Sequence, residues 1–246
     1  LKREEPIVQE LATEYLTEQG ITILNNVTLN SVSNDGGKPV ITANNQNYTF
    51  DAVLYATGRK ANTANIGLEH TDIATNERGA IVINDTCESS VPGVYAVGDV
   101  NGGPQFTYIS LDDFRIVFGA LTGNSQYTLK DRKNIPYTTF LTPPLSRVGL
   151  TEEDAINQGY TVKTKEMLVA TMPRAHVNDY LKGAFKIVVD ADNDLILGAT
   201  LYSQGAEELI NLIKMAMDNN IPYTYFKNQI FTHPTMAENL NDLCNF

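Results

Sequence analysis

The stretch at residues 93–100, which reads GVYAVGDV, constrains the fold of this chain more than any other part of its sequence. Its apolar, β-branched and aromatic residues predict a buried strand that ends at Gly98 and Asp99. In open α/β sheets, ligands bind at the carboxyl ends of the parallel strands. A carboxylate at that point can accept hydrogen bonds from sugar or polyol hydroxyls. Asp99 is therefore either a ligand-binding residue or the cap of the next helix.

The residues before this stretch have the pattern of a nucleotide-binding domain without its first βαβ unit. We predict an amphipathic helix at residues 6–19, followed by strands at 21–24, 27–33, 39–43 and 52–55. A further strand is expected at residues 79–83, ahead of the polar loop that leads to the stretch at 93–100.

Two segments of this region carry candidate ligand-binding positions. Residues 56–59 (ATGR) end a predicted strand at Gly58, where the missing side chain lets a cofactor approach the backbone, although a plain turn has the same pattern. The second segment is Gln105, Phe106, Thr107 and Tyr108, at the start of a helix predicted to run to about Leu121. A helix N-terminus stabilises negative charge on a bound ligand.

The pattern changes after the polar linker at residues 127–134. We predict a strand at 135–140, a proline-containing segment at 141–149, a short helix that Thr151 caps and that stops at Gly159, and a hairpin of strands 185–189 and 195–201. The apolar surface of the helix at residues 206–217 is much wider than the stripe of about 100° that faces a single core. We therefore expect this helix to be buried on more than one side, for example by a second subunit.

The end of the chain places a histidine beside a helix start. Thr235 and Glu238 have the spacing of a capping box, and His233 lies just outside the predicted first turn. A carboxylate that orients an imidazole fixes its tautomer and stabilises the imidazolium, as a general acid/base requires. The alternative interpretation is a common helix cap with a histidine nearby.

Composition excludes several classes of partner. The net charge of -11 argues against nucleic acids and anionic membranes. No apolar run reaches the length of about 18 residues that a transmembrane helix needs. Cys87 and Cys244 form neither a C-x-x-C pair nor a metal-binding pattern, so we predict no metal site and a reducing, cytoplasmic environment. The first residue is Leu1, which is expected of a fragment or a processed product.

The His-Pro-Thr-x-x-Glu pattern at residues 233–238 resembles the terminal motif of the pyridine nucleotide-disulfide oxidoreductases, which include glutathione reductase and dihydrolipoamide dehydrogenase. The stretches at 51–62, 93–100 and 143–152 resemble, in order, the crossing between the NAD(P) and FAD domains, the second FAD motif and the start of the interface domain of that family. The resemblance therefore spans nearly the whole chain.

This resemblance implies a role for each candidate residue. Asp99 would bind the ribityl chain of FAD, and Gly58 would lie at the domain crossing. Gln105, Phe106, Thr107 and Tyr108 would meet the pyrimidine end of the flavin. His233, oriented by Glu238, would be the acid/base for a dithiol in the opposite subunit of a homodimer.

Three parts of such an enzyme are absent from the sequence: the two G-x-G-x-x-G motifs and the C-x-x-x-x-C redox disulfide. We therefore interpret the chain as the C-terminal half of an FAD- and NAD(P)H-dependent reductase, and we expect the fragment to retain neither cofactor. The predicted fold class is α/β remnants of the cofactor-binding domains followed by an α+β dimerisation domain. The predicted domains are 1–57 (NAD(P)), 58–134 (FAD) and 135–246 (dimerisation).

The substrate would be a small-molecule disulfide or another thiol-reactive oxidised species. The end of the chain resembles most the branch of reactive-chlorine-resistance reductases. Mercuric reductases carry a terminal cysteine pair, whereas this chain has Cys244 alone and keeps His233 and Pro234, which those enzymes replace. Cys87 is interpreted as a packing residue. Two alternatives stay open: an inactive dimerisation module, and a relative of the single-cysteine NADH oxidases and peroxidases.

Overall fold

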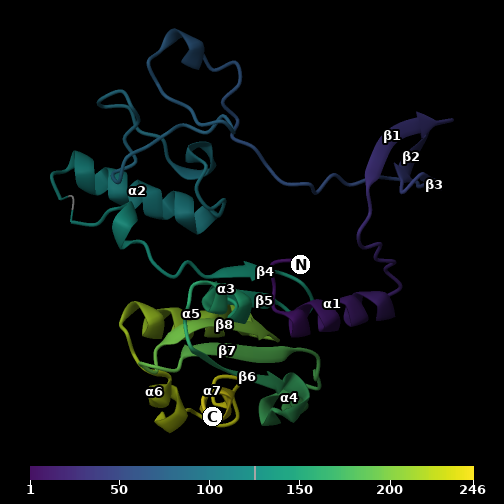
Figure 1. Ribbon diagram of the computed structural model, residues 1–246, viewed down its shortest axis with the longest axis vertical. Helices are drawn as coiled ribbons and strands as arrows, with labels where there is room; N and C mark the ends of the chain where they lie inside the picture. The colour runs from purple at the N-terminus through teal and green to yellow at the C-terminus, as the bar shows by residue number, and fades with distance from the viewer. Residues whose placement is uncertain (125) are drawn as a thin grey trace. The chain divides into compact units, whose positions relative to one another are not determined.

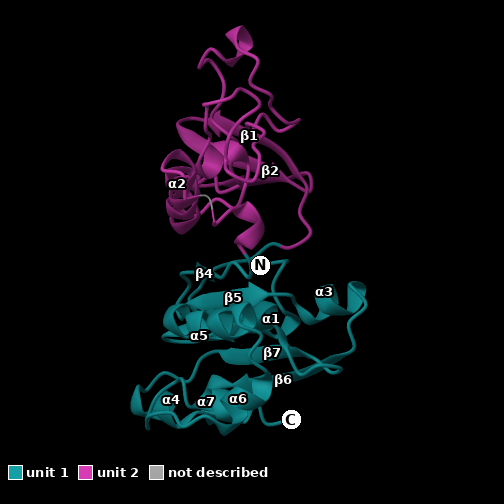
Figure 2. Ribbon diagram, turned by 90° about the vertical axis from the view of Figure 1, so that its left-hand side faces the viewer, with its two compact units in different colours: residues 1–24, 133–246 teal, residues 25–132 magenta. Residues whose placement is uncertain are grey.

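The computed structural model describes residues 1–124 and 126–246 and divides into two compact units. Unit 1 contains residues 1–24 and 133–246, drawn in teal in Figure 2, and unit 2 contains residues 25–132, drawn in magenta. Each unit is described by itself. Within the described residues, no helix has both the length and the apolar character needed to cross a membrane.

Unit 1 is built on a five-stranded antiparallel sheet with the order β4-β5-β8-β7-β6 (Figure 1). The strands are β4 (Tyr137–Thr139), β5 (Leu145–Gly149), β6 (Val162–Leu168), β7 (Ala184–Asp190) and β8 (Ile196–Tyr202). Every residue of β7 is buried. A strand covered on both faces carries little polar alternation, which is why the β7–β8 hairpin was predictable as two apolar runs.

Helices cover both faces of this sheet. Helix α5 (Ala206–Asp218) and the short helix α7 (Asn239–Leu243) pack on one face, where they bury Phe185, Ile187 and Leu201. Helix α1 (Pro6–Glu18) packs on the other face through Val8, Ala12 and Tyr15, against Leu145 and Tyr202. Because successive side chains of a strand point to opposite faces, Leu201 and Tyr202 belong to different cores.

The remaining helices of unit 1 are short. They are α3 (Glu152–Asn157), η4 (Val169–Thr171), α4 (Pro173–Val177) and α6 (Tyr223–Asn228). The predicted cap of α3 is confirmed, since Thr151 and Asp154 exchange the two hydrogen bonds of a capping box. Strand β6 and helices α4 and α6 were not predicted. Helix α5 buries one face against the sheet, while Leu212 and Met215 are 37% and 60% exposed.

A buried ion cluster joins α1 to the sheet. The ammonium of Lys186, on β7, lies 3.0 Å from a carboxylate oxygen of Glu5, 2.7 Å from Glu152 and 3.0 Å from Glu166. The side chains of Lys186 and Glu5 are only 5% and 3% exposed. Burial lowers the pKa of Lys186, but the hydrogen bonds to the three carboxylates outweigh it and hold that pKa above its usual value. One cation thus satisfies three glutamates from three elements.

Unit 2 begins with a three-stranded antiparallel meander in the order β1-β2-β3. Its strands are β1 (Leu29–Asp35), β2 (Lys38–Ala43) and β3 (Gln46–Thr49). The tight turn between β1 and β2 contains Gly36 and Gly37, and the side chain of Asn34 accepts a hydrogen bond from the Gly37 amide at 2.9 Å. Two of the predicted strands, 27–33 and 39–43, are therefore confirmed within two residues.

The rest of unit 2 is mostly irregular apart from one long helix. It contains η1 (Leu68–His70), η2 (Gly98–Asn101), α2 (Thr107–Leu121) and η3 (Leu129–Asp131). The predicted end of α2 at Leu121 is confirmed.

The strands predicted at 21–24, 52–55, 79–83 and 93–97 were wrong as ladders. Where these segments pair within the described chain, they do so only through isolated bridges, such as Thr75 with Ile81 and Glu88 with Tyr95. A strand is defined by its neighbours, and a run of apolar residues without a ladder partner stays irregular. Leu54, in the strand predicted at 52–55, illustrates the result, because it is 89% exposed. The predicted domain assignments at 1–57, 58–134 and 135–246 stay predictions.

Candidate functional site

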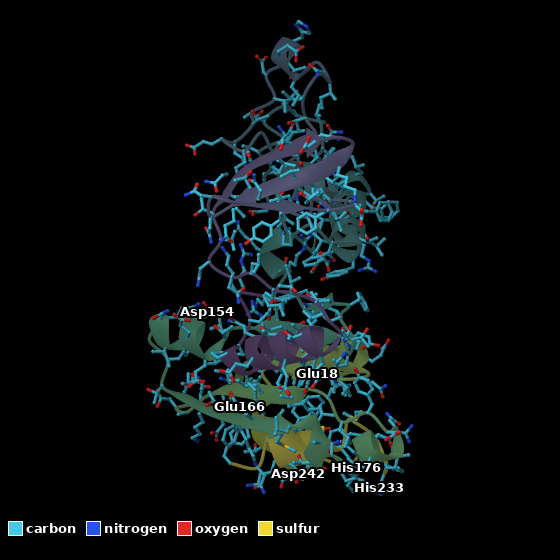
Figure 3. The ribbon with its side chains drawn as sticks, turned by 90° about the vertical axis from the view of Figure 1, so that its right-hand side faces the viewer. Glu18, Asp154, Glu166, His176, His233 and Asp242 are labelled. Carbon is cyan, nitrogen blue, oxygen red and sulfur yellow. The ribbon has the colours of Figure 1, made fainter. Side chains whose placement is uncertain are left out.

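His233 and Glu238 meet in unit 1, on a loop between α6 and α7. The Nδ1 atom of His233 lies 2.7 Å from Oε2 of Glu238. The imidazole is 69% exposed, whereas the Glu238 side chain is 19% exposed. Figure 3 shows His233 at the edge of the unit, beside His176 of α4. Arg174 of α4 donates a hydrogen bond to the carbonyl of Pro234 at 3.4 Å, so α4 lies next to this loop.

The backbone fixes the carboxylate of Glu238. Its Oε1 atom accepts a hydrogen bond from the amide of Thr235 at 3.0 Å, while the Thr235 hydroxyl accepts one from the Glu238 amide at 3.2 Å. These reciprocal bonds are those of the predicted capping box. One carboxylate oxygen is thus held by the chain, and the other faces the imidazole.

The helix itself starts later than predicted. Residues 236–238 form a turn, and α7 begins at Asn239. The amides of Asn239 and Leu240 donate to the carbonyls three residues earlier, Met236 and Ala237, which is tighter than an α-helical turn. Glu238 therefore precedes the helix instead of lying in its first turn, although its bonds to Thr235 are unchanged.

The electrostatics of the pair favour the charged form of Glu238. The hydrogen bond from His233 lowers the pKa of Glu238, and the bond from the Thr235 amide adds to this effect. Glu238 is therefore a carboxylate that accepts a proton-bearing Nδ1. The Nε2 atom of His233 is then the nitrogen that can give or take a proton on the exposed side.

In unit 2, Asp99 lies within η2 and not at the end of a strand. Its carboxylate is 45% exposed and lies 3.5 Å from the guanidinium of Arg59, the residue after Gly58. Gly58 has a φ of 108° and nothing within 4 Å of the position of a Cβ atom, so the backbone there is open. Gly58 and Asp99, both predicted to bind the cofactor, thus lie close together, because Arg59, which follows Gly58, contacts Asp99.

The start of α2 follows η2. Gln105 and Phe106 are half-buried, and Phe106 is the N-cap residue, from which no side-chain cap forms within the described part of the chain. The rings of Phe106 and Tyr108 stack with centroids 5.0 Å apart. Burial raises the pKa of Tyr108. Thr107 is exposed in the first turn, where backbone amides point out of the helix.

The sequence did not identify Asp113, which anchors η2 to α2. Asp113 is fully buried and accepts hydrogen bonds from the Gly98 amide at 2.7 Å and from the Asn101 side chain at 2.9 Å. It also pairs with Arg132. Gly98 has a φ of 71°, and a Cβ atom there would lie 2.6 Å from the Ser110 hydroxyl. Asp113 lies on the same buried face of α2 as Ile109 and Ile116. A charged residue at helical spacing with two apolar ones could have identified it from the sequence.

Both cysteines are free and fully buried. Burial raises the pKa of the Cys87 thiol to about 11 and that of Cys244 to about 12. Neither is therefore a thiolate near neutral pH. Across the described residues, no group of three or more His, Cys, Asp or Glu side chains is arranged to hold a metal ion.

Comparisons with known proteins cover nearly the whole chain. A family model described as pyridine nucleotide-disulphide oxidoreductase matches residues 1–113, and the model of its dimerisation domain matches residues 135–244. These matches confirm the predicted fold class, in which α/β remnants of cofactor-binding domains precede an α+β dimerisation domain.

Similar curated proteins include the probable pyridine nucleotide-disulfide oxidoreductase RclA of Escherichia coli K12, which is 42% identical over 99% of this chain and 55% of its own length. A mercuric reductase of Staphylococcus aureus is 34% identical, over 97% of this chain and 44% of that protein. The solved structure of the HOCl-induced flavoprotein disulfide reductase RclA from Escherichia coli is 41% identical with a TM-score of 0.94, over 99% of this chain and 56% of that one. The chain thus spans about half the length of the curated relatives it matches.

Proposed function

This chain belongs to the pyridine nucleotide-disulphide oxidoreductase family, and we propose that it forms the C-terminal half of an FAD-dependent, NAD(P)H-linked disulfide reductase. In that scheme electrons pass from the nicotinamide to FAD, then to a redox disulfide, then to the substrate. The coverage of about half of each relative supports this assignment. The alternative is that the chain alone is a dimerisation module without activity.

The proposal for catalysis rests on the 2.7 Å contact between His233 Nδ1 and Glu238. His233 would transfer protons through Nε2 to and from a dithiol, and Glu238 would hold the tautomer and stabilise the imidazolium. An imidazolium beside a cysteine favours the reactive thiolate. Both free cysteines of this chain are buried, so the dithiol would come from the missing half, in the partner subunit of a homodimer.

FAD would bind through unit 2. When bound, FAD supplies the hydride-accepting and electron-donating chemistry that amino-acid side chains lack. The carboxylate of Asp99, which is 45% exposed, fits a hydroxyl-rich ribityl chain, and the N-terminal end of α2 at residues 105–108 fits the electron-rich end of a flavin. The open backbone at Gly58 leaves room for a cofactor beside Asp99. Asp113 would keep η2 in place for this contact.

The substrate we propose is a small-molecule disulfide or another oxidant that reacts with thiols. One relative is described as an HOCl-induced flavoprotein disulfide reductase, and others as mercuric reductases. Handling a metal ion at the end of the chain would need an accessible thiolate. Cys244 is buried and its raised pKa keeps it protonated, which argues against that role. Free cysteines also favour a reducing, cytoplasmic location.

The test separates the two half-reactions of the full-length enzyme by stopped-flow spectroscopy. General acid/base catalysis contributes about 10²–10⁴-fold, so His233→Ala should slow disulfide reduction within that range and leave flavin reduction by NAD(P)H unchanged. A matched control is His176→Ala, since His176 is exposed on neighbouring α4 and, among the described residues, its side chain bonds only the carbonyl of Ala170 in η4. Equal effects of His233→Ala on both half-reactions, or no effect, would refute the proposed role. The substrate should be a disulfide, because a metal ion takes electrons without needing a proton.

A further inference from the structure

The loop that carries His233, residues 229–238, connects two short helices. It leaves α6 after Asn228 and returns at α7, which begins at Asn239. Ile230 is 92% exposed and the His233 side chain is 69% exposed. Other parts of the loop are anchored, since Phe231, Met236 and Ala237 pack against the core of unit 1. The exposed imidazole of His233 lacks such packing, so its position also depends on what holds the ends of the loop.

The side chain of Asn241 holds those ends together. From the first turn of α7, its amide nitrogen donates to the carbonyl of Phe226 at 2.6 Å and to that of Gln229 at 2.9 Å, with a longer contact of 3.4 Å to Lys227. These acceptors lie 12 to 15 residues earlier in the chain, at the end of α6 and the start of the loop. The side chain of Asn241 thus connects the first residues of the loop to the helix that follows it.

Helix α7 is a rigid support for this contact. Leu240 and Leu243 are fully buried in the core of unit 1. The ammonium of Lys165, on β6, donates to the carbonyls of Asp242 at 2.7 Å and Asn245 at 2.6 Å, which satisfies the C-terminal end of α7. Asn241 is therefore fixed to the sheet, and Glu238 lies only three residues before it.

We propose that Asn241 is a positioning residue for His233: it fixes the loop so that the imidazole stays against Glu238 and is presented in one orientation. The catalytic consequence of this inference rests on the proposed acid/base function of His233. The effect of Asn241 on the position of the imidazole does not depend on that function. The backbone amide of Asn241 donates to the carbonyl of Glu238 at 3.0 Å, whereas its side chain bonds the carbonyls of Phe226, Lys227 and Gln229. The effect of the side chain would therefore pass through the two ends of the loop.

The inference can be tested by nuclear magnetic resonance on this chain labelled with ¹⁵N-histidine, which gives signals from only three histidines. The hydrogen bond to Glu238 should keep the neutral ring of His233 in the Nδ1–H tautomer. Asn241→Asp keeps the size of the side chain but replaces a donor with an acceptor facing carbonyls. Asn241→Ala removes the donor without adding charge. Both should shift His233 towards the Nε2–H tautomer.

Asn228→Asp is the matched control, because Asn228 ends α6 and its side chain, within the part of the chain that the structure describes, donates only to the carbonyl of Thr224 in that helix, at 3.0 Å. It should keep the wild-type tautomer. In the full-length enzyme, Asn241→Ala should slow disulfide reduction by up to about 10²-fold, the effect of a small misplacement of a catalytic group, with flavin reduction unchanged.

The outcomes separate this inference from the proposed function. A wild-type tautomer in both Asn241 variants, or unfolding of both, would overturn the positioning role. If the tautomer shifts but His233→Ala leaves disulfide reduction unaffected, the positioning role stands and the catalytic role of His233 fails. If His233→Ala is slow while Asn241→Ala is as fast as the wild type, the catalytic role stands and the positioning role fails.

Discussion

Replacing Lys186 with Met should destabilise unit 1 strongly, because it removes the one cation shared by Glu5, Glu152 and Glu166. Breaking a buried ion pair by deleting one partner costs about 3–5 kcal/mol, since the other charge stays buried. Of the three glutamates, only Glu5 would be left as a buried charge, because its side chain is 3% exposed. Glu152 and Glu166 are 37% and 43% exposed, so each contributes at most about 1 kcal/mol.

We therefore expect Lys186→Met to lower the free energy of unfolding by about 3–5 kcal/mol at pH 7, measured by urea denaturation of this chain.

Two controls make the reasoning refutable. Glu166→Gln removes an exposed partner and should cost no more than about 1 kcal/mol. Adding Glu5→Gln to Lys186→Met should recover part of the loss, because a neutral pair no longer leaves a buried charge. A loss below about 1 kcal/mol for Lys186→Met would show that the cluster is hydrated and contributes little.

Three further predictions follow from the other sites. Glu238→Gln should lower stability near pH 7, and its difference from the wild type, read from urea midpoints, should vanish as the pH falls through the Glu238 pKa, which lies below the usual 4.5. This chain, purified alone, should show no flavin absorption band, whereas Asp99→Ala in the full-length enzyme should weaken FAD retention, measured by release on dilution; a yellow purified fragment would contradict the first expectation. Sedimentation should show a dimer that buries the exposed residues Leu212 and Met215 of α5, and a monomer that persists when the full-length enzyme is concentrated would contradict it.

Helices and hairpins with local signals could be predicted from the sequence. Helix α2 ends at Leu121, as expected from the glycine that follows, and the β7–β8 hairpin matches its two apolar runs. The strand predicted at residues 93–97 failed for a physical reason. Whether an apolar segment becomes a strand depends on a partner elsewhere, and the described chain offers it one bridge, between Glu88 and Tyr95.

The same distinction applies to the candidate site. His233 and Glu238 are five residues apart, so their spacing and the capping pattern were enough to predict their contact. Asn241 and Asp113 were not found, because their partners lie far along the chain and their residue types are common on helices. A single buried aspartate on the apolar face of α2 was the available signal for Asp113.

The division into units has a consequence for synthesis of the chain. Both ends of unit 2 connect to unit 1, so unit 2 is an insertion between α1 and the sheet that α1 covers. The hydroxyl of Tyr15 accepts a hydrogen bond from the amide of Gly183, which is made 168 residues later. At about 5–20 residues per second, the ribosome needs roughly 10–30 s to add them. During that time Val8, Ala12 and Tyr15 lack their partners on the sheet, so unit 1 completes its fold only after unit 2 has been synthesised.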